Sequence, residues 1–143
     1  MMRLSKTVDA PASFIFDKLV ESSLYDIKQQ TGESIHFEAL KGYTYHKTFQ
    51  NKQKAEITIT EVVKNETYEF ITVMMLREYK TRYQLKALGE NSCEIICEEK
   101  QVSHGVLQRY NDMIMEILIG WQKKKQMRYM FDGMAKVYHE SKI

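Results

Sequence analysis

Only a few side chains in this sequence are placed to do chemistry, and two of them are carboxylates on strand-like segments. In KAEITITEVV and SCEIICEEK the odd-numbered residues are mostly apolar and would share one face of a strand. Glu61 and Glu99 are on that face. Lys47 has the same position in YTYHKTF. A charge that is buried without a partner is very costly. We therefore expect each of these three groups to be paired, to reach solvent at a strand end, or to line a wet cavity.

Two interpretations of these ionisable groups stay open. In the first, they form a polar patch in a ligand pocket, where a carboxylate could act as an acid or a base. In the second, a strand end or a register slip at a β-bulge brings them to solvent. Tyr45, Tyr83 and Tyr110 are similarly ambiguous. A buried tyrosine either presents its hydroxyl to a cavity or belongs to the core with its hydroxyl satisfied at the edge.

Neither a metal site nor a disulfide is expected. No two histidines have metal-ligand spacing. The four are His36, His46, His104 and His139. Cys93 and Cys97 lie four residues apart on a strand-like segment, which places them about 13 Å apart. A disulfide needs Cα atoms within about 7 Å. We therefore expect both cysteines to be buried and reduced.

No sequence motif identifies an enzyme or a nucleic-acid-binding protein. The chain has no nucleophile elbow, phosphate-binding loop or dinucleotide fingerprint, so we expect no catalytic residue and no cofactor. The formal net charge of +2 is too small to indicate nucleic acid. A basic cluster just past Trp121 comprises Lys123, Lys124, Lys125 and Arg128. We interpret it as a solvated helix face, with an anion, membrane or nucleic-acid contact as the alternative.

The opening of the chain predicts a strand followed by a helix. Residues 2–8 read as a strand, and Pro11 marks the switch. Proline is tolerated in the first turn of a helix because its missing N–H would be unsatisfied there anyway. Apolar residues then recur at helical spacing, which predicts a helix over residues 11–28. Gly32 ends that unit.

The middle of the chain predicts an antiparallel sheet. Residues 33–42 could hold one short helical turn closed by Gly42. The hydrophobic period then changes to two, in the runs YTYHKTF, KAEITITEVV, TYEFITVMM, EYKTRYQLKAL and SCEIICEEK. The breaks QNKQ, KNE and GENS are typical of hairpins, and MMLR is a weaker turn signal. One wet face and one dry face per strand is typical of an antiparallel sheet.

The last part of the chain predicts one long helix. After VSHG the apolar residues return to a period of 3.6 over residues 106–139. Such a helix would be about 50 Å long, whereas a compact domain of this size is under about 40 Å across. We therefore expect the helix to bend or break near Gly120, because glycine weakens a helix interior.

Length and composition indicate one ordinary globular domain. The 143 residues are 43% hydrophobic and 28% charged, which suits a single domain over residues 1–143. Arg3 and Lys6 interrupt the stretch that a signal peptide would need to be apolar. The longest apolar run, MIMEILIGW, is far shorter than the roughly 20 residues of a membrane span. We expect a cytoplasmic protein without a membrane span.

This order of elements resembles the helix-grip architecture of the START and polyketide-cyclase superfamily (SRPBCC). The resemblance is most specific in KTVDAPASFIFDKLVES, where a strand leads through an alanine-proline dipeptide into an aromatic helix. The chain is also similar to a family of small bacterial proteins with the same APASFIFDKL opening and an SHG before the last helix. That family has no established activity, so no catalytic residue is carried over. The resemblance implies an α+β fold in which a curved antiparallel sheet of about six strands wraps around a long C-terminal helix.

The same resemblance implies a cavity between the sheet and the long helix, often holding an apolar or amphipathic small molecule. We therefore predict a binding module for such a ligand. The candidate cavity residues are Tyr45, Glu61, Phe70, Tyr83, Glu99, Tyr110, Met113 and Ile114. Two alternatives stay open. One is a cyclase- or hydratase-like enzyme that uses Glu61 or Glu99. The other is an interaction module that binds a protein partner or a second copy of itself through the outer sheet or the basic helix.

Overall fold

The computed structural model describes residues 2–49, 52–75, 77–102 and 106–141, and the side chains of all of these except residues 102–123. This described part of the chain has an α+β fold. In chain order the elements are β1 (Met2–Val8), α1 (Ala12–Thr31), the short 3-10 helix η1 (Phe37–Ala39), β2 (Thr44–Thr48), β3 (Lys54–Val63), β4 (Thr67–Met74), β5 (Arg77–Gly89), β6 (Ser92–Val102) and α2 (Val106–Ser141). The predicted succession of elements and the number of strands are confirmed.

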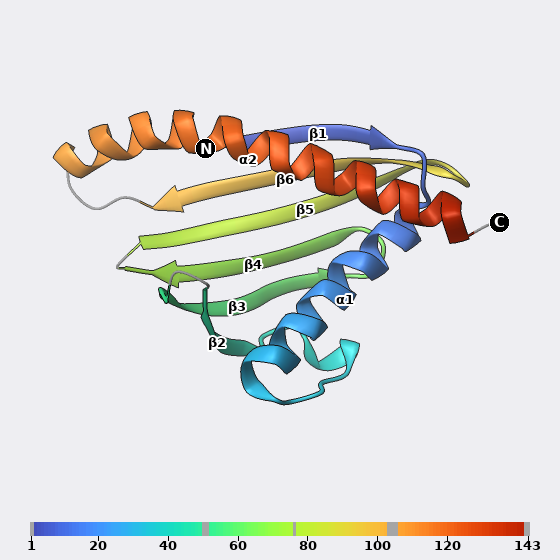
Figure 1. The fold of residues 1–143 in the computed structure, drawn as a ribbon, viewed down its shortest axis with the longest axis horizontal. Coiled ribbons are helices and arrows are strands. Elements are labelled where there is room, and N and C mark those ends of the chain that lie inside the picture. The colour runs from blue at the N-terminus through green and yellow to red at the C-terminus, as the bar shows by residue number, and fades with distance from the viewer. Residues whose placement is uncertain (1, 50–51, 76, 103–105, 142–143) are drawn as a thin grey trace.

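The strands form one six-stranded sheet in the order β1-β6-β5-β4-β3-β2 (Figure 1). Every pair of neighbouring strands is antiparallel. Alternate residues of each strand share a face. Leu4 lies opposite Cys97, Cys97 opposite Tyr83, and Tyr83 opposite Tyr68. All four side chains are buried, so this row belongs to the predicted dry face.

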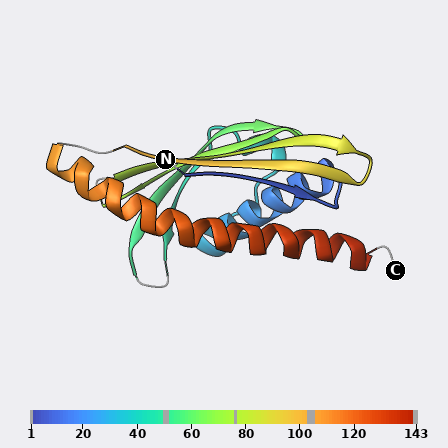
Figure 2. The ribbon, with the colours of Figure 1, turned by 90° about the horizontal axis from the view of Figure 1, so that it is seen from above.

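Both α-helices lie on the dry face, which curves toward them (Figure 2). α2 runs along the β1 and β6 side of the sheet, whereas α1 crosses it diagonally toward β2 (Figure 1). Side-chain contacts fix these positions. Lys6 Nζ of β1 lies 3.0 Å from Asp132 Oδ1 of α2, and the ring of Phe131 meets Tyr83 of β5 edge-on at 6.3 Å. The hydrophobic core therefore lies between one face of the sheet and the two helices.

The switch from β1 to α1 takes place at Pro11, as predicted. Pro11 is the N-cap residue, with an extended backbone (φ −63°, ψ 147°), and its carbonyl accepts the first helical hydrogen bonds. Gly32 ends α1 in the left-handed conformation (φ 77°), and its N–H donates to the carbonyl of Lys28 at 2.8 Å. A side chain at this φ would be strained, so glycine is the natural helix terminator here.

α2 is a single helix of 36 residues that continues through Gly120, so of the two expected outcomes, a bend or a break, the break is wrong. At 1.5 Å per residue it is about 54 Å long. The prediction assumed a roughly spherical domain, but β5 alone has 13 residues and extends about 43 Å. The long strands make the domain elongated, and α2 runs along it without a break (Figure 1). No helix in the described part of the chain is both long and apolar enough to cross a membrane.

A bulge in β3 changes which residues face the core. Ile59 lies opposite Phe70, but the next pair in register is Glu61 with Glu69. Beyond the bulge Val62 lies opposite Tyr68 and packs against the core. Strict alternation from Ile59 would have put Glu61 on the dry face, and the extra residue shifts it away. The register slip foreseen as an alternative for Glu61 is therefore present.

Both cysteines are buried thiols that form no disulfide, as predicted. They lie on the inner side of β6, and the thiol of Cys97 is 3.5 Å from the sulfur of Met127 on α2. Burial raises the pKa of the Cys93 thiol, so the unreactive neutral form is favoured. Both belong to the hydrophobic core, and Cys97 packs against α2.

We predict that Phe131→Ala lowers the free energy of unfolding by about 3–5 kcal/mol, because a large buried aromatic leaves a cavity when it is removed. Phe131 is 0% exposed, whereas Tyr129, two residues away on α2, is 83% exposed. Tyr129→Ala is the matched control and should cost under about 0.5 kcal/mol. Urea unfolding of both variants measures the difference. Equal losses would contradict the packing of α2 on the sheet.

Candidate functional site

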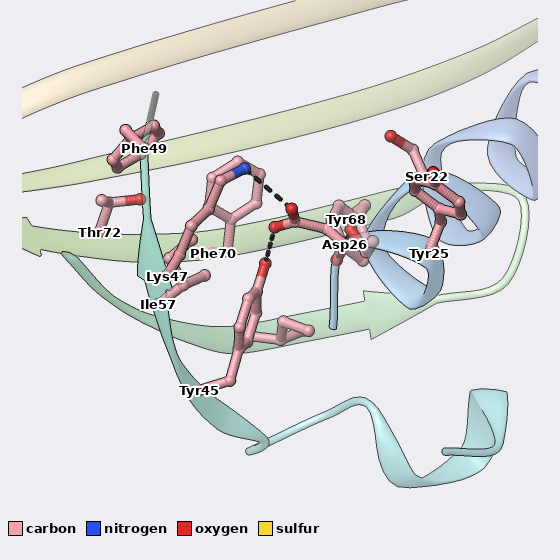
Figure 3. Close-up of a pocket in the computed structure, with 12 residues that line it drawn as sticks. Ser22, Tyr25, Asp26, Tyr45, Lys47, Phe49, Ile57, Tyr68, Phe70 and Thr72 are labelled. Carbon is pink, nitrogen blue, oxygen red and sulfur yellow. Dashed lines mark hydrogen bonds and ion pairs between the residues drawn. The ribbon is translucent and has the colours of Figure 1, made fainter. Parts of the chain in front are cut away.

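A cavity of about 320 Å³ lies between the C-terminal half of α1 and strands β2, β3 and β4 (Figure 3). It opens on the dry side of the sheet. α1, β2, β3 and β4 supply the described residues that line it. These are Ser22, Ser23, Tyr25, Asp26, Tyr45, Lys47, Phe49, Ile57, Ile59, Tyr68, Phe70 and Thr72.

The helix side of the cavity is polar because polar residues interrupt the apolar stripe of α1, which resumes at the buried Ile27. Ile15, Phe16 and Leu19 are buried against the sheet in the first turns. One to two turns further on, Ser23 and Asp26 take positions that continue the stripe, so polar groups face the strands there. Ser23 accepts a short hydrogen bond from the hydroxyl of Tyr68 on β4. The helix thus closes the cavity through hydrogen bonds instead of apolar packing.

The charged end of the cavity is built around the carboxylate of Asp26. The hydroxyl of Tyr45 donates to Asp26 Oδ2 at 2.6 Å, and Lys47 Nζ lies 3.0 Å from Asp26 Oδ1. Figure 3 shows the three groups converging from α1 and β2. The ammonium of Lys47 also lies 5.1 Å from the centre of the Phe49 ring, a cation–π contact. Lys47 therefore has a partner and also lines the cavity.

The phenols of this site hold their protons strongly. Burial raises the pKa of Tyr68 to about 12. Burial, followed by the hydrogen bond to Asp26, raises the pKa of Tyr45 well above its ordinary value. An ionised phenolate would lose its solvation and face the negative charge of Asp26. Both tyrosines consequently act as neutral hydrogen-bond donors over the whole physiological range of pH.

The opposite wall is aromatic. The ring of Phe70 is near those of both Tyr68 and Tyr83, with ring centres 5.9 and 6.4 Å away. Ile57 and Ile59 of β3 complete the wall beside it. A cavity with an aromatic wall and a few convergent polar groups is the usual form of a small-molecule site.

The predicted site residues are only partly brought together. Tyr45 and Phe70 line the cavity. Tyr83 lies beside it in the core, against Phe70 and Phe131, and burial raises its pKa far above the ordinary value. Glu99 is also on the inner face, close enough to Tyr83 to contribute to that rise. Neither Tyr83 nor Glu99 is among the described lining residues.

The other predicted residues lie elsewhere or outside the described side chains. Glu61 is displaced by the bulge and pairs with Lys41, at 3.3 Å between Nζ and Oε1. It does not line the cavity. Tyr110, Met113 and Ile114 belong to the part of α2 whose side chains lie outside the described residues.

Sequence reasoning missed the residues that α1 contributes. Asp26 supplies the cavity carboxylate, whereas Glu61 and Glu99 had been nominated. A signal was present in the sequence, because Ser22, Ser23 and Asp26 are polar residues at helical spacing on or beside the apolar stripe. That signal alone does not show that α1 stands against β2, since the pairing joins residues about 20 positions apart.

The structure also shows where His46 and part of the basic cluster lie. His46 lies on the outer face, with Nε2 3.5 Å from a carboxylate oxygen of Glu56. Among the described residues no group of three potential ligands could hold a metal ion. Lys125 and Arg128 of the basic cluster are exposed on α2, and Lys123 lies outside the described side chains.

Comparison with known proteins gives a family and a fold. A family model described as a domain of unknown function, DUF3284, matches residues 2–120. No curated protein matches the chain. Among solved structures, norcoclaurine synthase from Thalictrum flavum has a TM-score of 0.64 and 16% identity over 97% of this chain and 86% of its own. Protein CV1439 from Chromobacterium violaceum has a TM-score of 0.53 and 15% identity over 96% and 95%.

A third similar structure is DynU16, from the dynemicin biosynthetic locus, with a TM-score of 0.61 and 14% identity over 97% of this chain. The chain spans only 46% of the length of DynU16. At these identities the likeness shows the fold alone, which is the helix-grip fold. The resemblance noted in the sequence is confirmed.

We predict that alkaline pH destabilises the protein through its buried phenols. The unfolded chain releases the Tyr68 proton near pH 10, whereas the folded chain keeps it until about pH 12. The free energy of unfolding should therefore be unaffected by Tyr68 below pH 10 and fall by about 1.4 kcal/mol per pH unit between these values. Urea unfolding at several pH values measures the slope. Tyr68→Phe lacks this proton, so its free energy of unfolding should fall less steeply between pH 10 and pH 12, by about 1.4 kcal/mol per pH unit. An unchanged slope would contradict the burial of this hydroxyl.

Proposed function

The chain belongs to the DUF3284 family, and from the arrangement of its cavity we propose that it is a binding module for an apolar or amphipathic small molecule. The observation that carries the proposal is the division of the cavity into two ends. Phe70, Ile57 and Ile59 form an apolar wall, and Asp26 with its partners forms a polar end. Such a surface fits a ligand that is itself amphipathic.

The size of the cavity supports a small ligand. A volume of about 320 Å³ lies at the lower end of the range of roughly 300–1,000 Å³ for small-molecule sites. The polar groups at its charged end already bond to one another, so the site is organised without a ligand. Preorganisation of this kind lowers the ordering cost of binding.

Similar structures add support of a more general kind. Norcoclaurine synthase has been solved with dopamine and hydroxybenzaldehyde bound, and both are small aromatic molecules. DynU16 comes from a biosynthetic locus. With the shared fold and an aromatic wall of its own, this chain is best suited to a ligand with a flat apolar part.

A cyclase- or hydratase-like reaction is the second candidate, because one carboxylate lines the cavity. Asp26 could accept a proton from a bound molecule. Both of its oxygens already have protein partners, Tyr45 and Lys47, however, so a proton taken from a bound molecule would disturb these contacts. Binding without chemistry is therefore the leading proposal, and a turnover that is lost in Asp26→Asn while binding persists would favour the enzyme.

We predict that a neutral fluorescent probe such as 6-propionyl-2-dimethylaminonaphthalene binds in the cavity and raises the melting temperature as its concentration rises, as mass action requires. Thr72→Trp, which adds bulk on a lining residue of β4, should weaken probe binding at least about tenfold, a loss of about 1.4 kcal/mol. Fluorescence titration gives the dissociation constants.

Val73→Trp is the matched control. Val73 is the next residue of β4 and points to the exposed outer face. The same substitution there should leave the dissociation constant of the probe within about twofold of the parent value. If the probe neither binds nor stabilises the parent protein, or if both tryptophan variants behave alike, the proposed ligand site is wrong.

A further inference from the structure

The polar end of the cavity is balanced in charge. Among the described lining residues, Asp26 and Lys47 are the two that carry a formal charge at neutral pH, and they carry opposite signs. Their atoms lie 3.0 Å apart, and each side chain is only about a quarter exposed, at 24% for Asp26 and 26% for Lys47. The pair therefore contributes no net charge to the cavity.

This balance discriminates against charged ligands. An ion entering the cavity loses much of its hydration and finds each complementary group already neutralised by a protein partner. An anion would have to draw Lys47 away from Asp26, and a cation would have to draw Asp26 away from Lys47 and Tyr45. Either exchange leaves one partly buried charge uncompensated, which is the costly outcome for an ion pair.

The same pair is well suited to an uncharged polar group. The ammonium of Lys47 has three donors, and the pairing with Asp26 occupies one of them. The carboxylate of Asp26 has about four acceptor positions, and Tyr45 and Lys47 take two. A hydroxyl group can donate to the carboxylate and accept from the ammonium at once, and a carbonyl group can accept from the ammonium.

We infer that the occupant of this cavity is an uncharged molecule that presents a hydroxyl or carbonyl group to the Asp26–Lys47 pair and lays its flat apolar part against Phe70. The inference rests on the proposed function and narrows its ligand to one chemical class. It also assigns Asp26 and Lys47 as the residues that determine the charge of the ligand.

Three probes of one shape and different charge test the inference. They are 2-naphthol, 2-naphthoate and 2-naphthylmethylammonium, which are neutral, anionic and cationic near neutral pH. Calorimetric titration of the parent protein should give 2-naphthol a dissociation constant at least about tenfold lower than that of either ion. A parent that binds either ion more tightly than 2-naphthol overturns the inference.

Removal of one charge of the pair should make the cavity prefer one ion over the other, and the preferred ion should differ between the two variants. Lys47→Met leaves Asp26 without its cation, so 2-naphthylmethylammonium should then bind about tenfold more tightly than 2-naphthoate. Asp26→Asn leaves Lys47 alone, and the order of the two ions should be the reverse. If the order of the ions is the same in both variants, the pair does not determine ligand charge and the inference fails.

The ion pair of Lys41 with Glu61 supplies matched controls, because it lies outside the described cavity lining. Lys41→Met and Glu61→Gln remove one charge each and should leave the order of the three probes as in the parent. Melting curves of all four variants establish that they are folded. If the larger neutral probe of the preceding section binds but none of the three naphthalenes does, the inference is overturned while the proposed function stands; if no probe binds, both fall.

Discussion

A sheet with only one dry face is the constraint on which the rest of this structure depends. Apolar side chains of all six strands gather on one side, and burying them is the main favourable term in folding. Both helices must therefore share that side. α2 covers the β1 and β6 half, and α1 reaches the β2 half only obliquely. The cavity is the part of the dry face that the described side chains of the two helices do not fill.

On both faces of the sheet, a buried or half-buried carboxylate is paired with a cationic side chain. On the outer face the carboxylate of Glu69 is only 6% exposed. It accepts hydrogen bonds from Arg82 at 3.0 Å and from Thr60 at 2.9 Å. On the inner face Asp26 is held by Tyr45 and Lys47. Removing either partner of such a pair costs more than the pair contributes, because the remaining charge loses its compensation.

The fold could be predicted from the sequence because its signals are local. Alternation in the strands, the proline at the start of α1 and the helical period after residue 106 each need only a few neighbouring residues. The candidate site could be predicted only in part. Tyr45 and Phe70 follow from strand alternation, but the bulge after Ile59 moves Glu61 off the inner face. Asp26 reaches the cavity through the packing of α1 on β2, a long-range arrangement that no local pattern encodes. The continuity of α2 through Gly120 was likewise missed, because no local pattern shows that the long strands make the domain elongated.

The two sides of the cavity differ in how firmly they are held. β3 and β4 have hydrogen-bonded neighbours on both sides, whereas β2 is a five-residue edge strand bonded only to β3. On its other side, side chains of α1 hold it. One of them is Gln30, whose side-chain amide oxygen Oε1 accepts a hydrogen bond from the backbone N–H of Thr48 at 3.0 Å. Local opening of a protein concentrates in such weakly connected elements. Amide hydrogens of β2 should therefore exchange with solvent sooner than those of β3 and β4, and a molecule that bridges α1 and β2 would slow that exchange selectively. Hydrogen exchange of the β2 amides would thus report whether the cavity is occupied.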